Sequence, residues 1–252
     1  MKYYIFESGS KGNSTLIESS GRYLLIDMGI SKKKLVSKLS EINLSFDAIN
    51  YVLVTHNHSD HIAGLDSFKP EQIYSTKLTY EDVPLANELI PYNEYKINGF
   101  KVFTLPTSHD AQGSIGFIID DGNEKLVYIT DTGYLYEKTV ELISDADYYI
   151  MESNHNVKML INTSRPQTLK RRIMGDYGHL SNEDSANYIC DVISKKTKEI
   201  VLAHLSEEAN SPEQAIDDYK KVFRQRGVDF ASYNIRCASQ KDTISGGHDG
   251  KL

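Results

Sequence analysis

The sequence is short of the features that mark secreted proteins, membrane proteins and proteins that coat nucleic acid. Its 252 residues include only two cysteines, Cys190 and Cys237, which are too few for a disulfide framework and are expected to be reduced thiols. No stretch approaches the ~18 apolar residues of a membrane-spanning helix, and the start, MKYYIFESGS, has no apolar core long enough for export. The net charge of −7 argues against a generally basic surface, so a polyanion would need a local basic patch or bound metal. We therefore expect a cytoplasmic protein that does not associate with membranes.

The chain also has no linker-like run, no low-complexity tract and no short repeat. Its length suits one large α/β domain or two small ones. We expect a single domain over residues 1–244. The last residues, SGGHDGKL from Ser245, are expected to form a flexible tail over 245–252.

The order of predicted elements indicates the fold class. Strands are followed by a helix and a further strand, and this order occurs twice, which favours two sheets packed face to face with helices outside. Ser31 and Ser181 are predicted to cap helices at their amino ends, and Pro212 is predicted to begin the last one. The expected strands are 3–7, 15–18, 23–26, 50–55, 72–75, 100–105, 115–119, 126–130, 148–152 and 200–203. The expected helices are about 31–41, 137–143, 181–194 and 212–226.

The strongest functional signal is the run HNHSDH, which begins where the predicted strand 50–55 ends. It places four potential metal ligands, His56, His58, Asp60 and His61, within six residues. Their spacing differs from the HExxH pattern of helical zinc proteases. A loop leaving a buried strand can turn His56 and His58 towards one metal and Asp60 and His61 towards another, and imidazole and carboxylate suit Zn²⁺, Fe or Mn²⁺.

Three more ligand-type residues come directly after predicted strands. His109 follows FTLPTS, Asp131 follows VYIT and His204 follows VLA. Residues just beyond strand ends commonly carry function in α/β proteins. Each alone is more often an ordinary polar residue, but together with the histidine run they indicate a metal site.

These motifs resemble the metallo-β-lactamase superfamily, whose fold is a four-layer αββα sandwich of the α/β (α+β) class. A nearer resemblance is to the YycJ/WalJ/VicX group of bacterial single-domain metallohydrolases. It covers about residues 3–210, and the segment 64–101 matches poorly. The motifs that carry it are SGSKGNSTLIE, LLIDMGIS, LVTHNHSDHIAGL, TSHDA, TDTGY, ESNH, LKRRIMGDYGHLSNEDSAN and AHLSEEAN.

The resemblance implies two divalent metal ions, Zn²⁺ or Mn²⁺, with a hydroxide between them that attacks phosphorus. The Asp60 carboxylate would belong to the catalytic machinery as well as to the ligands. The implied ligands are His56, His58 and His109 for the first ion and Asp60, His61 and His204 for the second, with Asp131 bridging.

Residues around the ligands receive roles by the same resemblance. Asp27 is expected to fix the histidine loop, through an imidazole or the backbone. His179 is expected to protonate the leaving oxygen, oriented by Glu152. The alternative for His179 is that it only helps to start the helix capped by Ser181.

Candidate substrate contacts are His155, Arg171, Arg172 and Asn13. His155 could face the substrate phosphate or be structural. Arg171 and Arg172, with Lys170 before them, could contact the phosphate backbone or be solvated surface. Asn13 belongs to a small-residue turn that could be a plain hairpin or a rim approached by substrate.

The predicted function is a dinuclear metal-dependent phosphodiesterase, a nuclease with 5′-exonuclease activity on single-stranded DNA. One alternative is a small-molecule cyclic phosphodiesterase. Another is a metal-binding accessory protein of a two-component signalling system, although seven intact ligand positions argue against a site that has lost its catalytic function.

Overall fold

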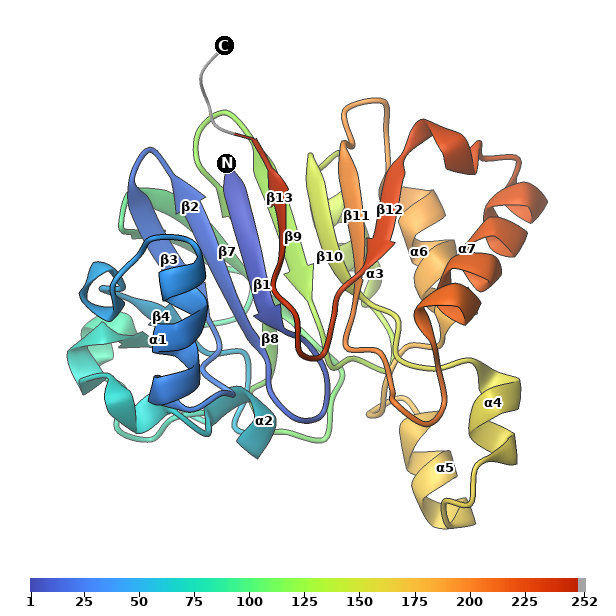
Figure 1. The fold of residues 1–252 in the computed structure, drawn as a ribbon, viewed down its shortest axis with the longest axis horizontal. Helices are drawn as coiled ribbons and strands as arrows, with labels where there is room; N and C mark the ends of the chain where they lie inside the picture. Colours follow the sequence, from blue (N-terminus) through green and yellow to red (C-terminus); the bar gives the residue numbers. More distant parts are fainter. Residues whose placement is uncertain (249–252) are drawn as a thin grey trace.

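Two β-sheets form the centre of the molecule, which a computed structural model describes for residues 1–248 (Figure 1). The first sheet has six strands and the second has seven. The first runs in the order β13 (Ile244–Gly247), β1 (Lys2–Glu7), β2 (Ser14–Ser19), β3 (Arg22–Ile26), β4 (Val52–Leu53) and β5 (Ile73–Tyr74). The second runs in the order β12 (Asn234–Cys237), β11 (Glu199–Ala203), β10 (Tyr148–Glu152), β9 (Lys125–Ile129), β8 (Ile115–Asp120), β7 (Phe100–Pro106) and β6 (Glu94–Ile97).

Strand direction decides where the functional loops lie. Strands β9 to β12 pair in parallel, with Ile129 opposite Met151 and Met151 opposite Leu202. In the other sheet β3 and β4 are parallel, with Ile26 opposite Leu53. The carboxyl ends of β9, β10 and β11 therefore lie side by side at one edge, as do those of β3 and β4.

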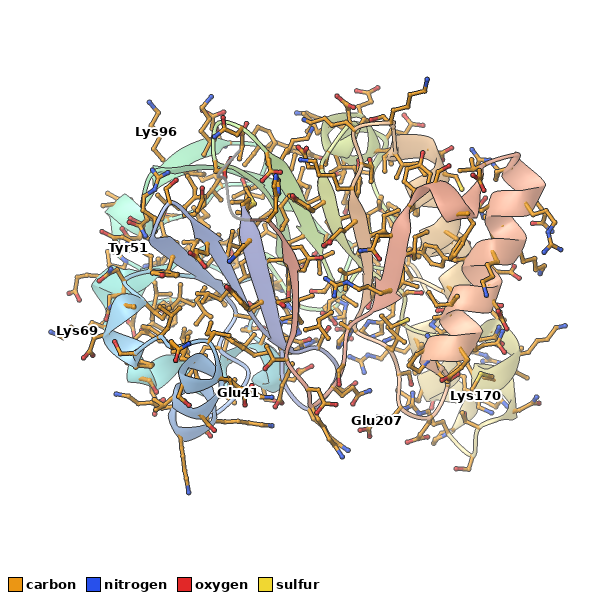
Figure 2. All side chains as sticks on the ribbon, turned by 45° about the horizontal axis from the view of Figure 1, so that its top comes forward. Glu41, Tyr51, Lys69, Lys96, Lys170 and Glu207 are labelled. Atoms are coloured by element: carbon orange, nitrogen blue, oxygen red, sulfur yellow. The ribbon has the colours of Figure 1, made fainter. Side chains whose placement is uncertain are left out.

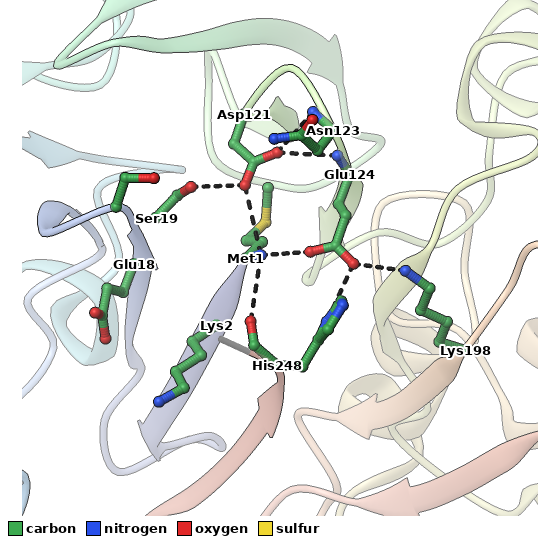
Figure 3. Close-up of a pocket in the computed structure, with 10 residues that line it drawn as sticks. Met1, Lys2, Glu18, Ser19, Asp121, Asn123, Glu124, Lys198 and His248 are labelled. Carbon is green, nitrogen blue, oxygen red and sulfur yellow. Dashed lines mark hydrogen bonds and ion pairs between the residues drawn. The ribbon is translucent and has the colours of Figure 1, made fainter. Parts of the chain in front are cut away.

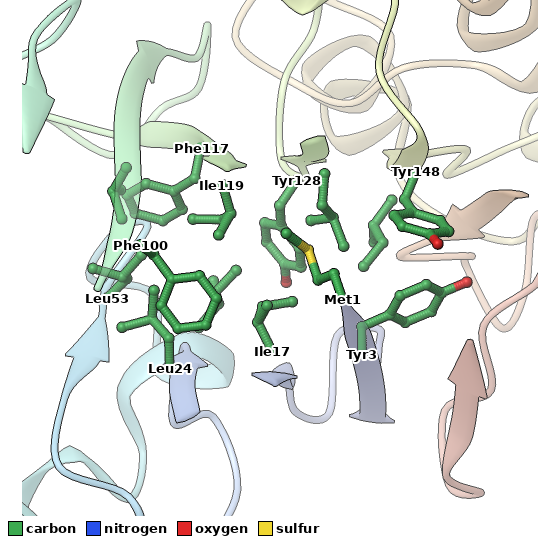
Figure 4. Close-up of a cluster of buried hydrophobic side chains, with 14 of the residues drawn as sticks. Met1, Tyr3, Ile17, Leu24, Leu53, Phe100, Phe117, Ile119, Tyr128 and Tyr148 are labelled. Carbon is green, nitrogen blue, oxygen red and sulfur yellow. The ribbon is translucent and has the colours of Figure 1, made fainter. Parts of the chain in front are cut away.

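The space between the sheets is filled by apolar side chains from both of them (Figure 4). Along β3, Leu24 and Ile26 face this inner core, whereas Leu25 faces the helix layer outside. Along β10, Tyr148 faces the inner core and Tyr149 the outer layer. Because strand side chains alternate between faces, a strand covered on both sides reads as a continuous apolar run.

Helices cover the outer faces of both sheets and complete the αββα sandwich that the sequence predicts. Helix α1 packs through Leu35 and Leu39 on the first sheet, and α6 and α7 pack through Ile189 and Phe223 on the second. The helices are α1 (Lys32–Glu41), α2 (Ser59–Ile62), α3 (Glu137–Ile143), α4 (Val157–Asn162), α5 (Gln167–Ile173), α6 (Asn182–Val192) and α7 (Pro212–Arg226). Long charged side chains such as Lys69 and Lys96 point outward at the periphery (Figure 2).

Local signals place the longer helices as predicted. Ser31 accepts a hydrogen bond from Lys34 N, and Ser181 accepts one from Asp184 N, so both serines cap their helices. Helix α7 begins at Pro212 and ends before Gly227, which takes a left-handed φ of 68°. These caps depend on neighbouring residues, which is why the sequence predicts them.

Other expectations differ from the structure. The strand expected over 50–55 is only Val52–Leu53, because Asp27 rather than a neighbouring strand accepts the Thr55 N–H. The flexible tail expected from Ser245 is wrong for Ser245–Gly247, which pair with β1 as part of β13. The end of that expected tail, 249–252, lies outside the described residues. Strands β6 and β12 and helices α2, α4 and α5 were not predicted.

None of the helices within residues 1–248 is long and apolar enough to cross a membrane. Both cysteines, Cys190 and Cys237, are free thiols.

Candidate metal centre and active site

The shared edge of the sheets gathers ligand-type residues from strands that are far apart in sequence. Asp27 follows β3, Asp131 follows β9, Glu152 ends β10 and His204 follows β11. Three of them turn sharply in the left-handed region, with φ of 59° at Asp27, 55° at Asp131 and 56° at His204. Such conformations are sparsely populated away from glycine and cluster at functional sites.

The histidine loop is held against the loop after β3. A short helix, α2, begins directly after His58 and turns Asp60 and His61 back towards the sheets. The carbonyl of Asp60 accepts a hydrogen bond from Asn13 N at 2.7 Å, and that of His61 accepts one from Met28 N at 2.8 Å. A Cβ on Gly29 would lie 1.7 Å from the Asp60 carbonyl oxygen, so this approach requires glycine.

The first group of candidate ligands contains His56, His58 and His109. One ligand atom from each lies within 4.8 Å of the others. The His109 and His58 rings are 4.9 Å apart, and His109 Nε2 lies 3.2 Å from His58 Nδ1. The structure therefore brings together the three residues assigned to the first metal.

The second group contains Asp60, His61 and His204, again with ligand atoms within 4.8 Å of one another. Asp60 Oδ2 lies 3.7 Å from His61 Nε2 and 3.8 Å from His204 Nε2. These are the three residues assigned to the second metal.

Asp131 lies between the two groups. Its Oδ2 is 3.1 Å from His61 Nε2, and its Oδ1 is 3.8 Å from His109 Nε2 and 3.3 Å from His204 Nδ1. The Asp131 carboxylate therefore lies within 4 Å of residues from both groups, as the bridging role expected from the resemblance requires.

The donor atoms fit divalent metal ions. His56 Nε2 and His204 Nε2 are buried without a hydrogen-bond partner, and buried Asp131 Oδ2 has only the His61 imidazole beside it. Leaving buried polar atoms unpaired costs about 1–3 kcal/mol each, so native structures rarely keep several in one place without a ligand. Imidazole nitrogens and carboxylate oxygens with no cysteine suit zinc and manganese. The clusters thus support divalent metal binding at this edge.

The charges of the site are strongly coupled. Burial lowers the pKa of the His61 imidazole, but the Asp27 and Asp131 carboxylates outweigh burial and raise it to about 10. Burial raises the pKa of Asp131, yet the His204 and His61 imidazoles hold it well below its ordinary value. Burial lowers the pKa of His56 and His109. The pKa shifts of His61 and Asp131 therefore have the same physical cause, the close approach of opposite charges inside the fold.

Asp27 is fully buried and ties the histidine loop to β3. Its Oδ2 accepts a hydrogen bond from His61 Nδ1 at 2.7 Å, and its Oδ1 accepts one from Thr55 N at 2.8 Å. The bond to Nδ1 leaves His61 Nε2 as the nitrogen that faces Asp60 and Asp131. Carboxylates commonly orient metal-binding histidines in this way.

Glu152 is also fully buried and connects His179 with His204. Its Oε1 accepts hydrogen bonds from His179 Nδ1 at 2.8 Å and His204 Nδ1 at 3.1 Å. Its Oε2 accepts from the backbone N–H groups of Thr132 and Leu180. Burial raises the pKa of Glu152, but the charge and hydrogen bond of His179 and the hydrogen bond of His204 lower it to about 2.

His179 lies next to both groups of candidate ligands. Its ring centroid is 5.2 Å from that of His109 and 5.3 Å from that of His204. With Nδ1 donating to Glu152, Nε2 remains available to a bound molecule. Its side chain is 18% exposed, which leaves it accessible from solvent.

A family model described as a beta-lactamase superfamily domain matches residues 22–205 of this chain. The chain belongs to the beta-lactamase superfamily. The WalJ exodeoxyribonuclease of Streptococcus pneumoniae is 34% identical over 251 residues, covering 92% of this chain and 93% of that protein. The YycJ exodeoxyribonuclease of Bacillus anthracis is 33% identical over 239 residues, covering 90% of both chains. The resemblance predicted from the sequence motifs is confirmed.

Solved structures agree on the fold of this superfamily member. The metallo-β-lactamase-fold protein YhfI from Bacillus subtilis superposes with a TM-score of 0.71 at 18% identity, covering 97% of this chain and 99% of that one. The short form of human tRNase Z gives a TM-score of 0.63 at 16% identity, covering 97% and 98%. At these identities the likeness shows the fold alone.

The candidate substrate contacts occupy different environments. Arg172 is exposed on α5, and its Nε forms an ion pair with Asp110, which lies 3.5 Å from both His58 and His109. Arg171 is exposed on the same helix.

His155 is buried with Nδ1 unpartnered and lines a pocket with Lys158, Ser181 and Lys221.

The rim position considered for Asn13 is wrong. Asn13 is fully buried, and its side-chain amide lies 2.9 Å from His61 Nε2 and donates to the Gly9 carbonyl at 3.1 Å. The turn around Asn13 is therefore folded inward onto the histidine loop.

Lys170 also differs from its exposed neighbours Arg171 and Arg172. Only 4% exposed, it donates hydrogen bonds to the carbonyls of Ile161 at 2.6 Å and Thr163 at 2.7 Å (labelled in Figure 2). Its ammonium group is thus engaged by carbonyls at the end of α4, unlike the unpartnered Nδ1 of His155, and Lys170 supports α4 and α5 rather than contacting phosphate.

Another pocket lies at the opposite edge of the sandwich, where β1 and β11 begin (Figure 3). The Met1 amino group forms ion pairs there with Asp121 and Glu124, and Lys198 pairs with Glu124. Its lining contains His248 but none of the candidate metal ligands, so this pocket is separate from the candidate metal centre.

Several residues that shape the site have no role that the sequence motifs predict. Ser8 Oγ accepts from His204 N at 2.8 Å, and Asn154 donates to the His204 carbonyl at 2.9 Å, which locks this left-handed residue. Gly29 allows the approach of Asp60. Both Ser8 and Gly29 stand in quoted motifs, SGSKGNS and LLIDMGIS, but their contacts cross between loops and leave no local pattern.

Proposed function

We propose that the chain is a dinuclear metal-dependent phosphodiesterase that degrades single-stranded DNA from the 5′ end. The observation that carries this proposal is the position of the His179–Glu152 pair directly beside two ligand groups joined by Asp131. Two relatives that match over at least 90% of the chain are named exodeoxyribonucleases. The free cysteines favour the cytoplasm as its location.

The metal-holding residues follow from the two groups. His56, His58 and His109 would hold one ion, and Asp60, His61 and His204 the other, with Asp131 shared. A pair of Zn²⁺ or Mn²⁺ ions would supply a water-derived nucleophile at neutral pH and would neutralise charge on the phosphodiester oxygens.

The protein's own groups would complete the reaction. Glu152 accepts the Nδ1–H of His179, which orients the ring so that Nε2 is left for the substrate. The proton at His179 Nε2 would pass to the leaving oxygen. Arg171 and Arg172 would contact phosphates beside the scissile one, and the unpartnered Nδ1 of His155 is a further candidate phosphate contact.

The test is degradation of a single-stranded oligonucleotide labelled at either end, with added Mn²⁺ or Zn²⁺. We expect the 5′ label to be released as a mononucleotide at once, whereas the 3′ label should give a ladder of shortening products. The Asp60→Ala variant should be inactive, and Asp47→Ala, at an exposed residue outside the site, should be unchanged. If the wild-type protein is fully loaded with metal and cuts no oligonucleotide, the proposed nuclease activity is rejected.

The same panel should contain a cyclic nucleotide. If only the cyclic phosphate is opened, the substrate is a small molecule. If no phosphodiester is cut at all, the chain is a metal-binding accessory protein.

A further inference from the structure

A basic projection stands beside the metal centre. Residues 157–177 form α4, α5 and the loop towards His179, and they project from the same edge as the histidine loop (Figure 1). This segment, the basic arm, contains five lysines and arginines and a single acidic residue, in a chain with a net charge of −7. A local positive charge of this kind attracts a polyanion that the rest of the surface repels.

The basic arm also exposes apolar side chains. Four of the eight large apolar side chains exposed on the described residues belong to it: Val157, Ile161, Met174 and Tyr177. Tyr177 is 65% exposed, and no other tyrosine or phenylalanine within residues 1–248 is as open to solvent. An exposed ring among cations is the combination with which proteins bind single-stranded nucleic acid.

The backbone around Tyr177 is fixed to the loops that carry the metal ligands. The Asp176 carbonyl accepts a hydrogen bond from Ser108 Oγ at 2.7 Å, and the Gly178 carbonyl accepts one from His109 Nδ1 at 3.1 Å. A Cβ on Gly133 would lie 2.2 Å from the Asp176 carbonyl oxygen, which shows how closely this loop packs on the one after Asp131. The Tyr177 backbone is thus held on both sides, by the Asp176 carbonyl bonded to Ser108 and by the Gly178 carbonyl bonded to His109.

The base of the arm is anchored too. Leu160 of α4 and Ile173 of α5 pack with Ala209 in a small apolar cluster, and Lys170 ties the two helices together. His179 N donates to the Ile173 carbonyl at 2.9 Å, which joins the end of α5 to the candidate acid. Tyr177 is therefore an exposed ring on an ordered support.

We propose that Tyr177 is a stacking platform for an unpaired nucleobase beside the scissile phosphate, with Arg171 contacting a neighbouring phosphate. This inference rests on the proposed function and names the part of the substrate that the arm recognises. Each of the four bases offers a flat π-face to the tyrosine ring, whereas bases inside a duplex are already stacked and paired. The platform thereby favours single strands without reading sequence.

The absence of tryptophan from the chain provides a direct test. A Tyr177→Trp protein carries a single tryptophan at the proposed platform. We expect its fluorescence to be quenched by a single-stranded oligodeoxynucleotide of about ten nucleotides. The same oligomer built from abasic residues should leave the fluorescence unchanged. The matched control is Val36→Trp, at a residue 43% exposed on α1, which should respond to neither.

This measurement is made with the metal-binding variant Asp60→Ala in the same chain, so no cleavage is needed. Quenching by the base-bearing oligomer alone supports stacking even if the wild-type protein proves not to be a nuclease. Equal quenching by both oligomers, or none, overturns the proposal whatever the activity assay shows.

Cleavage gives an independent comparison in the wild-type background. Tyr177→Ala should lower kcat/KM about 5- to 100-fold on the base-bearing strand and should have little effect on a strand that is abasic at its 5′ end. Tyr177→Phe should retain activity, because its ring stacks equally well. An equal loss on both strands would assign Tyr177 a structural role and overturn the proposal.

Discussion

At the residue scale, the site depends on carboxylates that hold histidines in one orientation. Asp27 and Glu152 are both fully buried, and each accepts the Nδ1–H of an imidazole in the candidate metal centre. The other nitrogen, Nε2, is thereby turned towards the place where an ion would bind. Such partners are worth about 10- to 100-fold in metal affinity in other proteins.

We expect Asp27→Asn to weaken metal binding by about that factor, because the amide cannot accept at both Thr55 and His61 with the strength of a carboxylate. Asparagine tolerates the left-handed φ of 59°, so the backbone is preserved. Titration calorimetry with Mn²⁺ measures the effect, and Asp47→Asn, at an exposed residue, is the control. An unchanged affinity would mean that Asp27 does not orient His61.

A second prediction concerns His179 and the protonation of the leaving group. His179→Ala should reduce turnover of an oligonucleotide about 10²- to 10⁴-fold, the usual range for a general acid. It should reduce turnover of bis-p-nitrophenyl phosphate much less, because p-nitrophenolate leaves without a proton.

Metal content should remain at the wild-type level in this variant, measured by elemental analysis. His248→Ala, at the opposite edge, is the matched control. A parallel fall in turnover and metal content would show that His179 is a ligand or a scaffold residue.

At the element scale, the strands determine where the ligands lie, and the short helices determine how they are presented. Parallel pairing of β9, β10 and β11 brings Asp131, Glu152 and His204 together. Helix α2 has four residues, too few to be stable alone, and it is held by contacts from the loop after β3. Helices α4 and α5 are similarly short and depend on each other.

Lys170 gives this dependence a test. Lys170→Met should keep most of the buried volume but leave the carbonyls of Ile161 and Thr163 without their donor, at a cost of about 1–3 kcal/mol. We expect faster hydrogen exchange confined to the basic arm, with the sandwich core unchanged.

Exchange measured by mass spectrometry locates the effect, and Lys33→Met, at an exposed residue of α1, is the comparison. Unaltered exchange in the arm would show that α4 and α5 do not rely on Lys170.

At the scale of the whole molecule, the sandwich supplies a rigid frame whose edge concentrates buried charge. The two sheets are joined by a continuous apolar core, and the ligand groups are contributed by loops from both sheets. The unpaired buried nitrogens of His56 and His204 are a cost that bound cations would remove. Metal binding should therefore stabilise the fold.

We expect Mn²⁺ or Zn²⁺ at 100 times its Kd to add about 2.7 kcal/mol, which raises Tm by roughly 5–10 °C for a protein of this size. Calorimetry with EDTA and with added metal measures the shift. The His56→Ala variant should show a smaller one, because it lacks a ligand. Equal Tm values with EDTA and with metal would contradict the proposed centre.

The sequence by itself determined the features that depend on near neighbours or on repeated pattern. The caps at Ser31 and Ser181, the helix starting at Pro212, the alternating strands and the HNHSDH run are of this kind. The position of each ligand candidate just after a strand also follows from the chain order. These observations predicted the αββα sandwich and the candidate ligands.

The family resemblance implied how the ligands are grouped, but only the tertiary structure decided how these residues pack. The pairing of His58 with His109, the burial of Asn13 and Lys170, and the strand at 244–247 all depend on contacts between segments far apart in the chain. The exposed ring of Tyr177 is one of 17 tyrosines, and its sequence neighbours do not distinguish it from those in the core. Burial is a property of the packed layers as a whole, so it cannot be read from a local stretch of sequence.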